Sequence, residues 1–66
     1  MKNSPSEIAA YVIENGRVIG EGDEWLESLE IEVEFESRAR GMQNSATVAR
    51  QAATIYRSNA TKRRSK

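Results

Sequence analysis

Residues 29–36 read Leu-Glu-Ile-Glu-Val-Glu-Phe-Glu, a strict alternation of apolar and acidic side chains. An extended strand projects successive side chains to opposite faces, so the octet would carry one apolar face and one acidic face. If the stretch were helical, Glu32 and Glu36 would fall within the apolar stripe of the helix. Glutamate favours helices, but periodicity is the stronger signal, and we predict a strand at residues 29–36.

The residues before this octet support two interpretations. Ser4-Pro5-Ser6-Glu7 is a capping box with proline at the first helical position, which predicts a helix that ends near Gly16. The stretch 11–19 is also typical of two short strands joined by Asn15-Gly16, a favoured hairpin turn. Asn-Gly can equally end a helix, so a hairpin remains the alternative to the helix that we favour. Val18-Ile19 would then form a short strand.

The residues after the octet are basic. Ser37 to Asn44 is expected to be a loop that carries Arg38 and Arg40. A final helix is expected near residues 45–59, capped by Asn44 or Ser45, and residues 61–66 are expected to form a flexible basic tail. The stripe that would face the core on this helix comprises Val48, Ala49, Ala52, Ile55 and Tyr56. The prediction is therefore an α+β fold in a single small domain over residues 1–60.

Size and composition exclude several classes of protein. The chain has 66 residues with no Cys and no His, which removes disulfides, thiol chemistry and most zinc sites. No apolar run approaches the roughly 20 residues that span a bilayer, and no signal peptide is apparent. No catalytic or nucleotide motif is present. We expect a noncatalytic cytoplasmic protein without cofactor or metal, which does not bind membranes and is stabilised by self-association.

Charge is divided sharply between the two halves of the chain. Residues 1–36 carry ten carboxylates against Lys2 and Arg17, whereas residues 37–66 carry eight basic residues and no acid. The net charge of zero therefore conceals a dipolar molecule. Such fields act on partners and association rates, so the sequence indicates an interaction surface rather than a reaction.

The basic half contains a row of arginines. Arg50, Arg57 and Arg64 are spaced seven residues apart, which places them within about 40° of one another on a helix. Guanidinium groups suit phosphate oxygens, and contacts to phosphates do not depend on base sequence. We therefore expect a regulatory accessory protein that binds DNA or RNA, of the kind found in compact phage or plasmid genomes. The expected phosphate contacts are Arg38, Arg40, Arg50, Arg57, Lys62, Arg63, Arg64 and Lys66.

The alternating glutamates provide an alternative function. A strand face of four carboxylates could dock a basic groove on a host protein, which would make the chain an inhibitor or a protein–protein module. It could also be a solvated face that discourages edge-to-edge aggregation. If the strand packs on the final helix, the acidic and basic rows lie on opposite sides, and copies could associate as a homodimer or head to tail. The carboxylates of this face are Glu30, Glu32, Glu34 and Glu36.

Two short stretches resemble families that bind nucleic acid. Gly41-Met-Gln-Asn-Ser-Ala-Thr-Val48, followed by an Ala/Arg-rich helix, resembles the turn and second helix of ribbon-helix-helix repressors. That resemblance implies a dimer with a two-stranded ribbon in the DNA major groove, with residues 23–40 as the first helix and Val18-Ile19 on the ribbon. Residues 45–53 are similar to the last helix of double-stranded-RNA-binding domains, although Ala46 and Thr47 stand where that family has paired lysines.

Overall fold

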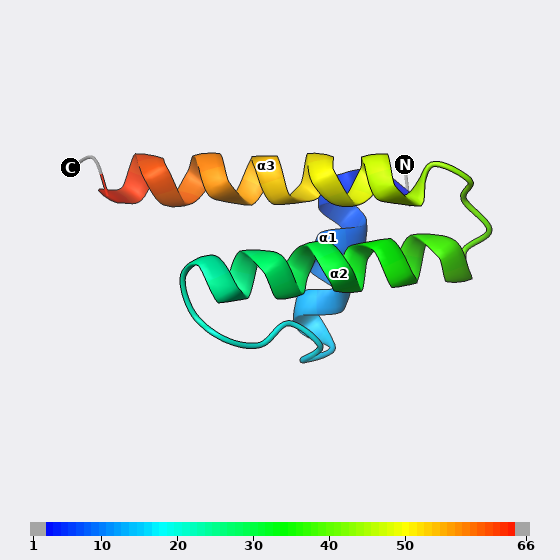
Figure 1. Cartoon of the computed structure of the whole chain (residues 1–66), viewed down its shortest axis with the longest axis horizontal. Coiled ribbons are helices and arrows are strands. Elements are labelled where there is room, and N and C mark those ends of the chain that lie inside the picture. Colours follow the sequence, from blue (N-terminus) through cyan, green and yellow to red (C-terminus); the bar gives the residue numbers. More distant parts are fainter. Residues whose placement is uncertain (1–2, 65–66) are drawn as a thin grey trace.

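The computed structural model describes the backbone of residues 3–64 and the side chains of residues 3–58. The described backbone contains three α-helices and no strand: α1 (Pro5–Glu14), α2 (Asp23–Ala39) and α3 (Ser45–Arg64). Helices α2 and α3 lie side by side and antiparallel, and α1 crosses them at a steep angle (Figure 1). The molecule measures 39 × 20 × 17 Å and is elongated because α3 extends beyond the start of α2.

The predicted α+β fold is wrong, because residues 29–36 lie entirely within α2. The hairpin considered for residues 11–19 and the short strand at Val18-Ile19 are also absent from the described backbone. The ribbon-helix-helix alternative correctly required a helix over most of residues 23–40, but the structure has α1 and a loop in place of the ribbon. The fold is an all-helical bundle.

Helix α2 buries one side at helical spacing. Leu26, Leu29, Val33 and Ser37 are buried, and they follow one another by three or four residues. The other two apolar residues of the octet, Ile31 and Phe35, remain 52% and 54% exposed. A strand would have buried all four apolar residues of the octet together, whereas the helix sends two inward and two outward.

Ser4 caps the start of α1, and the predicted N-terminal helix is confirmed. The Ser4 hydroxyl accepts a hydrogen bond from the backbone N–H of Glu7 at 3.3 Å, and Pro5 occupies the first turn. The helix ends in a Schellman motif in which Gly16 N–H donates to Ile13 and Arg17 N–H donates to Val12. Gly16 has φ +70°, a conformation that residues with a Cβ adopt only under strain.

Helix α2 ends in the same way at Gly41, which has φ +81°. Gly41 N–H donates to the carbonyl of Arg38 at 2.9 Å, and Met42 N–H donates to the carbonyl of Ser37 at 3.0 Å. The side chain of Met42 then packs against the core, as is usual for the residue after the glycine of this motif. This turn directs the chain back along α2 into α3.

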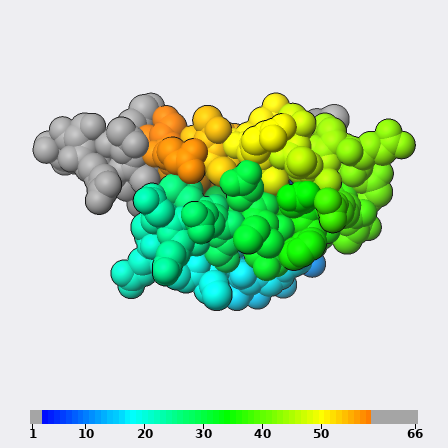
Figure 2. All heavy atoms as spheres, in the orientation of Figure 1, coloured from blue at the N-terminus to red at the C-terminus, as the bar shows by residue number. Residues whose placement is uncertain are grey.

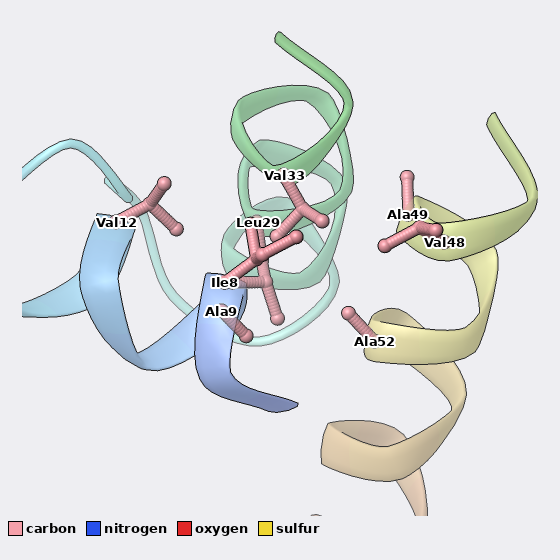
Figure 3. Close-up of a cluster of buried hydrophobic side chains, with 8 residues drawn as sticks. All are labelled: Ile8, Ala9, Val12, Leu29, Val33, Val48, Ala49 and Ala52. Atoms are coloured by element: carbon pink, nitrogen blue, oxygen red, sulfur yellow. The ribbon is translucent and has the colours of Figure 1, made fainter. Parts of the chain in front are cut away.

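The core lies between the three helices (Figure 3). Helix α3 contributes small residues, with Ala49, Ala52 and Ala53 buried, which allows its backbone to approach α2 closely. The predicted C-terminal helix is confirmed, but Ile55, expected on its inner stripe, is 39% exposed. Trp25 of α2 packs against the core and meets Tyr56 of α3, with ring centroids 5.7 Å apart. The cluster of buried side chains comprises Ile8, Ala9, Val12, Leu29, Val33, Val48, Ala49 and Ala52.

Candidate nucleic-acid interface

The side of α3 that faces away from the core is polar and basic, and we call it the α3 outer face. All of its described side chains are exposed, and none is acidic. On helical geometry they share a sector of about 120° centred opposite the buried alanines. The α3 outer face comprises Thr47, Arg50, Gln51, Thr54, Arg57 and Ser58.

Arg50 and Arg57 are the two described cations of this face. They are seven residues apart, so they project within about 20° of one another and are separated by a rise of about 10 Å. Among the described residues neither has an ion pair, whereas Arg17, Arg38 and Arg40 are each paired with carboxylates. Their guanidinium groups are therefore available to external anions.

An open, shallow hollow borders the α3 outer face where α3 passes the start of α1. Pro5 and Ile55 line it together with four residues of the α3 outer face, among them Arg50. Such a shallow depression suits the edge of a large partner better than an enclosed small ligand.

Two of the predicted phosphate contacts lie elsewhere and are held by carboxylates. Residues 37–39 belong to α2, so the predicted basic loop begins only at Arg40. Arg38 pairs with Glu34 at 2.8 Å and remains largely exposed. Arg40 pairs with Glu36 at 3.0 Å, donates to the Asn3 side chain, and stacks over the ring of Tyr11 at 5.1 Å. Arg40 therefore supports the fold.

The remaining predicted contacts fall at the C-terminal end. The backbone of Lys62, Arg63 and Arg64 continues α3 five residues beyond the predicted end at residue 59. Their side chains, and the whole of Lys66, lie outside the described residues. The flexibility predicted for residues 61–66 stays a prediction.

The four alternating glutamates do not share a face. Residues two apart on a helix point about 200° away from each other, so Glu30 and Glu34 lie on one flank of α2 while Glu32 and Glu36 lie on the other. Three of the four are paired with arginines within the molecule. The acidic strand face predicted from the sequence is therefore wrong in its geometry.

Arg17 was not singled out in the sequence, yet it organises one flank of α2. Its Nε donates to Glu32 Oε1 at 3.0 Å, and its Nη1 donates to Glu36 Oε1 at 2.7 Å. The turn after Gly16 positions Arg17 for both bonds. The separation of 15 and 19 residues carries no local sequence signal, in contrast to the helical i,i+4 spacing of Glu34 with Arg38 and of Glu36 with Arg40.

These contacts favour the charged forms of both partners. Hydrogen bonds from Arg17 first, and then from Arg40, hold the pKa of Glu36 below its ordinary value. The hydrogen bond to Glu36, followed by that to Glu32, raises the pKa of Arg17. The network joins the turn after α1 to the flank of α2 and carries no catalytic arrangement of its own.

Two other kinds of site were sought over the part of the chain that the structure describes. No three His, Cys, Asp or Glu residues come together there in a way that could hold a metal ion. None of the described helices combines the length and the apolar character needed to cross a membrane.

The geometry therefore separates an arginine pair on α3, which faces solvent, from arginines that the fold itself uses. Neither the ribbon-helix-helix nor the double-stranded-RNA-binding resemblance gains support from the comparisons with known proteins. No protein family, curated protein or solved structure matches this chain.

Proposed function

We propose that this chain is a noncatalytic, cytoplasmic nucleic-acid-binding protein of regulatory or accessory type, which contacts phosphates through the α3 outer face. The observation that carries the proposal is the pair Arg50 and Arg57. Both are exposed, lie on the same side of a helix without acidic residues, and have no partner among the described residues.

The chemistry of this face suits a phosphate backbone. Each guanidinium offers a rigid fork of donors that matches phosphate oxygens. Gln51 and Thr54 stand between the two arginines along the helix, and Thr47 lies one turn before Arg50; their amide and hydroxyl groups can add neutral hydrogen bonds. Contacts of this kind position a helix on a duplex and make affinity strongly dependent on salt.

The acidic residues of α2 limit how a polyanion can approach. Helix α2 lies directly beside α3 and carries seven carboxylates, of which Glu32, Glu34 and Glu36 are neutralised by arginines. Repulsion by the others favours contact from the side of α3 that faces away from α2. The sequence predicts further phosphate contacts from Lys62, Arg63, Arg64 and Lys66.

A matched pair of substitutions tests the proposal. Arg50→Gln and Arg38→Gln remove the same charge from exposed sites, but Arg38 is already paired with Glu34. Fluorescence anisotropy with labelled duplex DNA, duplex RNA and single strands should show a loss of about tenfold in affinity for Arg50→Gln. The loss for Arg38→Gln should be clearly smaller.

The double variant Arg50→Glu, Arg57→Glu is the stronger test. It should abolish binding to all three probes while circular dichroism shows an unchanged helical content. Binding that persists in the double variant would refute the assignment of the α3 outer face. Absence of binding by the unaltered protein, even at low salt, would refute the function itself, and the probe bound most tightly decides between DNA and RNA.

The protein–protein alternative survives only in altered form. A basic host partner could meet one flank of α2 at a time, and Glu30 is the member of the predicted row without an arginine partner among the described residues. Glu30→Lys distinguishes the two functions, because it should weaken binding to a basic protein and strengthen binding to nucleic acid.

A further inference from the structure

Helix α2 carries a second surface that neither the core nor the proposed function uses. Ile31 and Phe35 are one turn apart and point directly away from the buried side of α2, with 52% and 54% of their surface exposed. Glu24 and Glu27 lie on the same side toward the start of the helix, and Arg38 lies on it toward the end. We call these five residues the α2 outer face.

The surroundings of Ile31 enlarge the apolar area. The backbone N–H of Ile19 donates to the Ser28 hydroxyl at 3.0 Å, which fixes the loop before α2 against the helix. The Ile19 side chain is 71% exposed, and together with Ser28 and Ile31 it lines an open groove that carboxylates of α2 border. Figure 2 shows α2 in green at the surface beside α3, without another element in front of it. Exposed apolar side chains gathered in this way mark interaction sites more often than isolated ones do.

We propose that the α2 outer face binds the same face of a second copy, with the two α2 helices antiparallel across a two-fold axis that lies between them at the level of Val33. Ile31 and Phe35 lie two residues on either side of Val33. In this register Ile31 of each copy meets Phe35 of the other, and both apolar side chains leave water. In each copy, the groove lined by Ile19 and Ile31 lies beside this contact.

Charge complementarity selects this occupant and this orientation. Glu27 lies six residues before Val33 and Arg38 lies five residues after it, so the same register sets Glu27 of one copy near Arg38 of the other. Arg38 donates to Glu34 through Nη2, but its side chain stays 63% exposed, so its remaining donors can reach this second carboxylate. A parallel arrangement would instead oppose Glu27 to Glu27 and Arg38 to Arg38, which repel. A uniformly basic or acidic partner would satisfy only one end of the face.

The contact is expected to be weak. One helix face is smaller than the roughly 800 Å² per partner of a standard interface, so the dissociation constant should lie in the micromolar range. The pairing leaves the α3 outer face free, and it does not depend on nucleic-acid binding. The two proposals can therefore fail separately.

Sedimentation equilibrium of the full chain over a concentration series tests the pairing. The unaltered protein should shift from monomer to dimer, including at high salt, because the centre of the contact is apolar. Phe35→Glu should weaken dimerisation by about tenfold or more. Ile55→Glu, the matched change at an exposed apolar residue of α3, should leave it unchanged, and circular dichroism should show that both variants fold.

A protein that stays monomeric up to about 1 mM, the weak limit of specific association, would overturn the proposal. Equal dimerisation by the Phe35→Glu variant would overturn it as well.

A charge exchange tests the orientation. Glu27→Arg and Arg38→Glu should each weaken the dimer, because each opposes like charges across the two-fold. The double variant should restore the affinity, because the charges face each other again with signs exchanged. Failure of the double variant to recover, while circular dichroism shows it folded, would overturn the antiparallel register.

Discussion

Helices α2 and α3 lie side by side, yet they use their charged residues in opposite ways. On α2, the carboxylates of Glu32, Glu34 and Glu36 are paired with arginines from the same molecule. On α3, Arg50 and Arg57 face solvent and have no ion pair among the described residues. The acidic helix therefore uses three of its seven carboxylates within the fold, while the described arginines of the basic helix face solvent.

The comparison shows why net charge alone is a poor guide to a binding surface. The sequence predicted phosphate contacts from Arg38 and Arg40 as well as from Arg50 and Arg57. In the structure, however, Arg38 and Arg40 form ion pairs with carboxylates of the same chain. A cation that is paired internally gains less from a phosphate, since it must first give up its partner. Substitutions that separate structural charges from free ones therefore test the account.

The largest effect should come from the buried side of α2. Leu29→Ala removes a fully buried side chain and should lower the free energy of unfolding by about 3 kcal/mol, enough to unfold much of so small a domain. Ile31→Ala, two residues away on the exposed side, should change it by less than about 0.5 kcal/mol. Urea unfolding followed by circular dichroism measures both free energies. Equal losses would indicate that Leu29 and Ile31 are both buried, as a strand would require.

A smaller loss is expected from the flank of α2. Arg17→Gln deprives Glu32 and Glu36 of their shared partner and should cost about 1–2 kcal/mol in the free energy of unfolding. The same change at Arg57, which has no ion pair among the described residues, serves as the control. If both variants unfold at the same urea concentration as the unaltered protein, the flank network does not stabilise the fold.

The pH dependence of stability should reveal the same network. The pKa of Glu36 is lower in the folded chain than its ordinary value, because Arg17 and Arg40 donate hydrogen bonds to it. Its stabilisation is therefore complete above the unfolded pKa of about 4.3 and is lost as the pH falls through the lower folded pKa. Unfolding free energies measured from pH 7 to pH 3 should fall at the acid end, and less steeply for Glu36→Gln. Identical curves would contradict the assignment.

The smallest effect on stability belongs to α3. The double variant Arg50→Gln, Arg57→Gln alters two exposed side chains, and glutamine is a good helix former. Its free energy of unfolding should stay within about 0.5 kcal/mol of the unaltered value. A loss comparable to that of Arg17→Gln would show that these arginines are structural too.

Local signals in the sequence predicted the first and last helices. The Ser4 capping box and the glycine after Asn15 mark the bounds of α1, and they act within one turn of the chain. The apolar stripe of α3 was also visible, although Ala53 rather than Ile55 turned out to be buried. The exposed positions of Arg50 and Arg57 followed from the same helical spacing.

The second helix could not be predicted from alternation alone. Glu32 and Glu36 seemed to rule out a helix because they border its apolar side. They are tolerated there because Arg17 reaches them from a distant turn and Arg40 reaches Glu36 from the next turn of the helix. The exposure of Ile31 and Phe35 could not be predicted either, because the expected strand would have buried both side chains.

The most direct test of the division between the two helices is the salt dependence of binding to a labelled duplex. If Arg50 and Arg57 contact phosphates, replacing both by glutamine should make the slope of log affinity against log salt shallower by about 1.8, since each contact contributes about 0.9. Arg38→Gln should change that slope far less. A slope left unchanged by the double replacement would contradict the account.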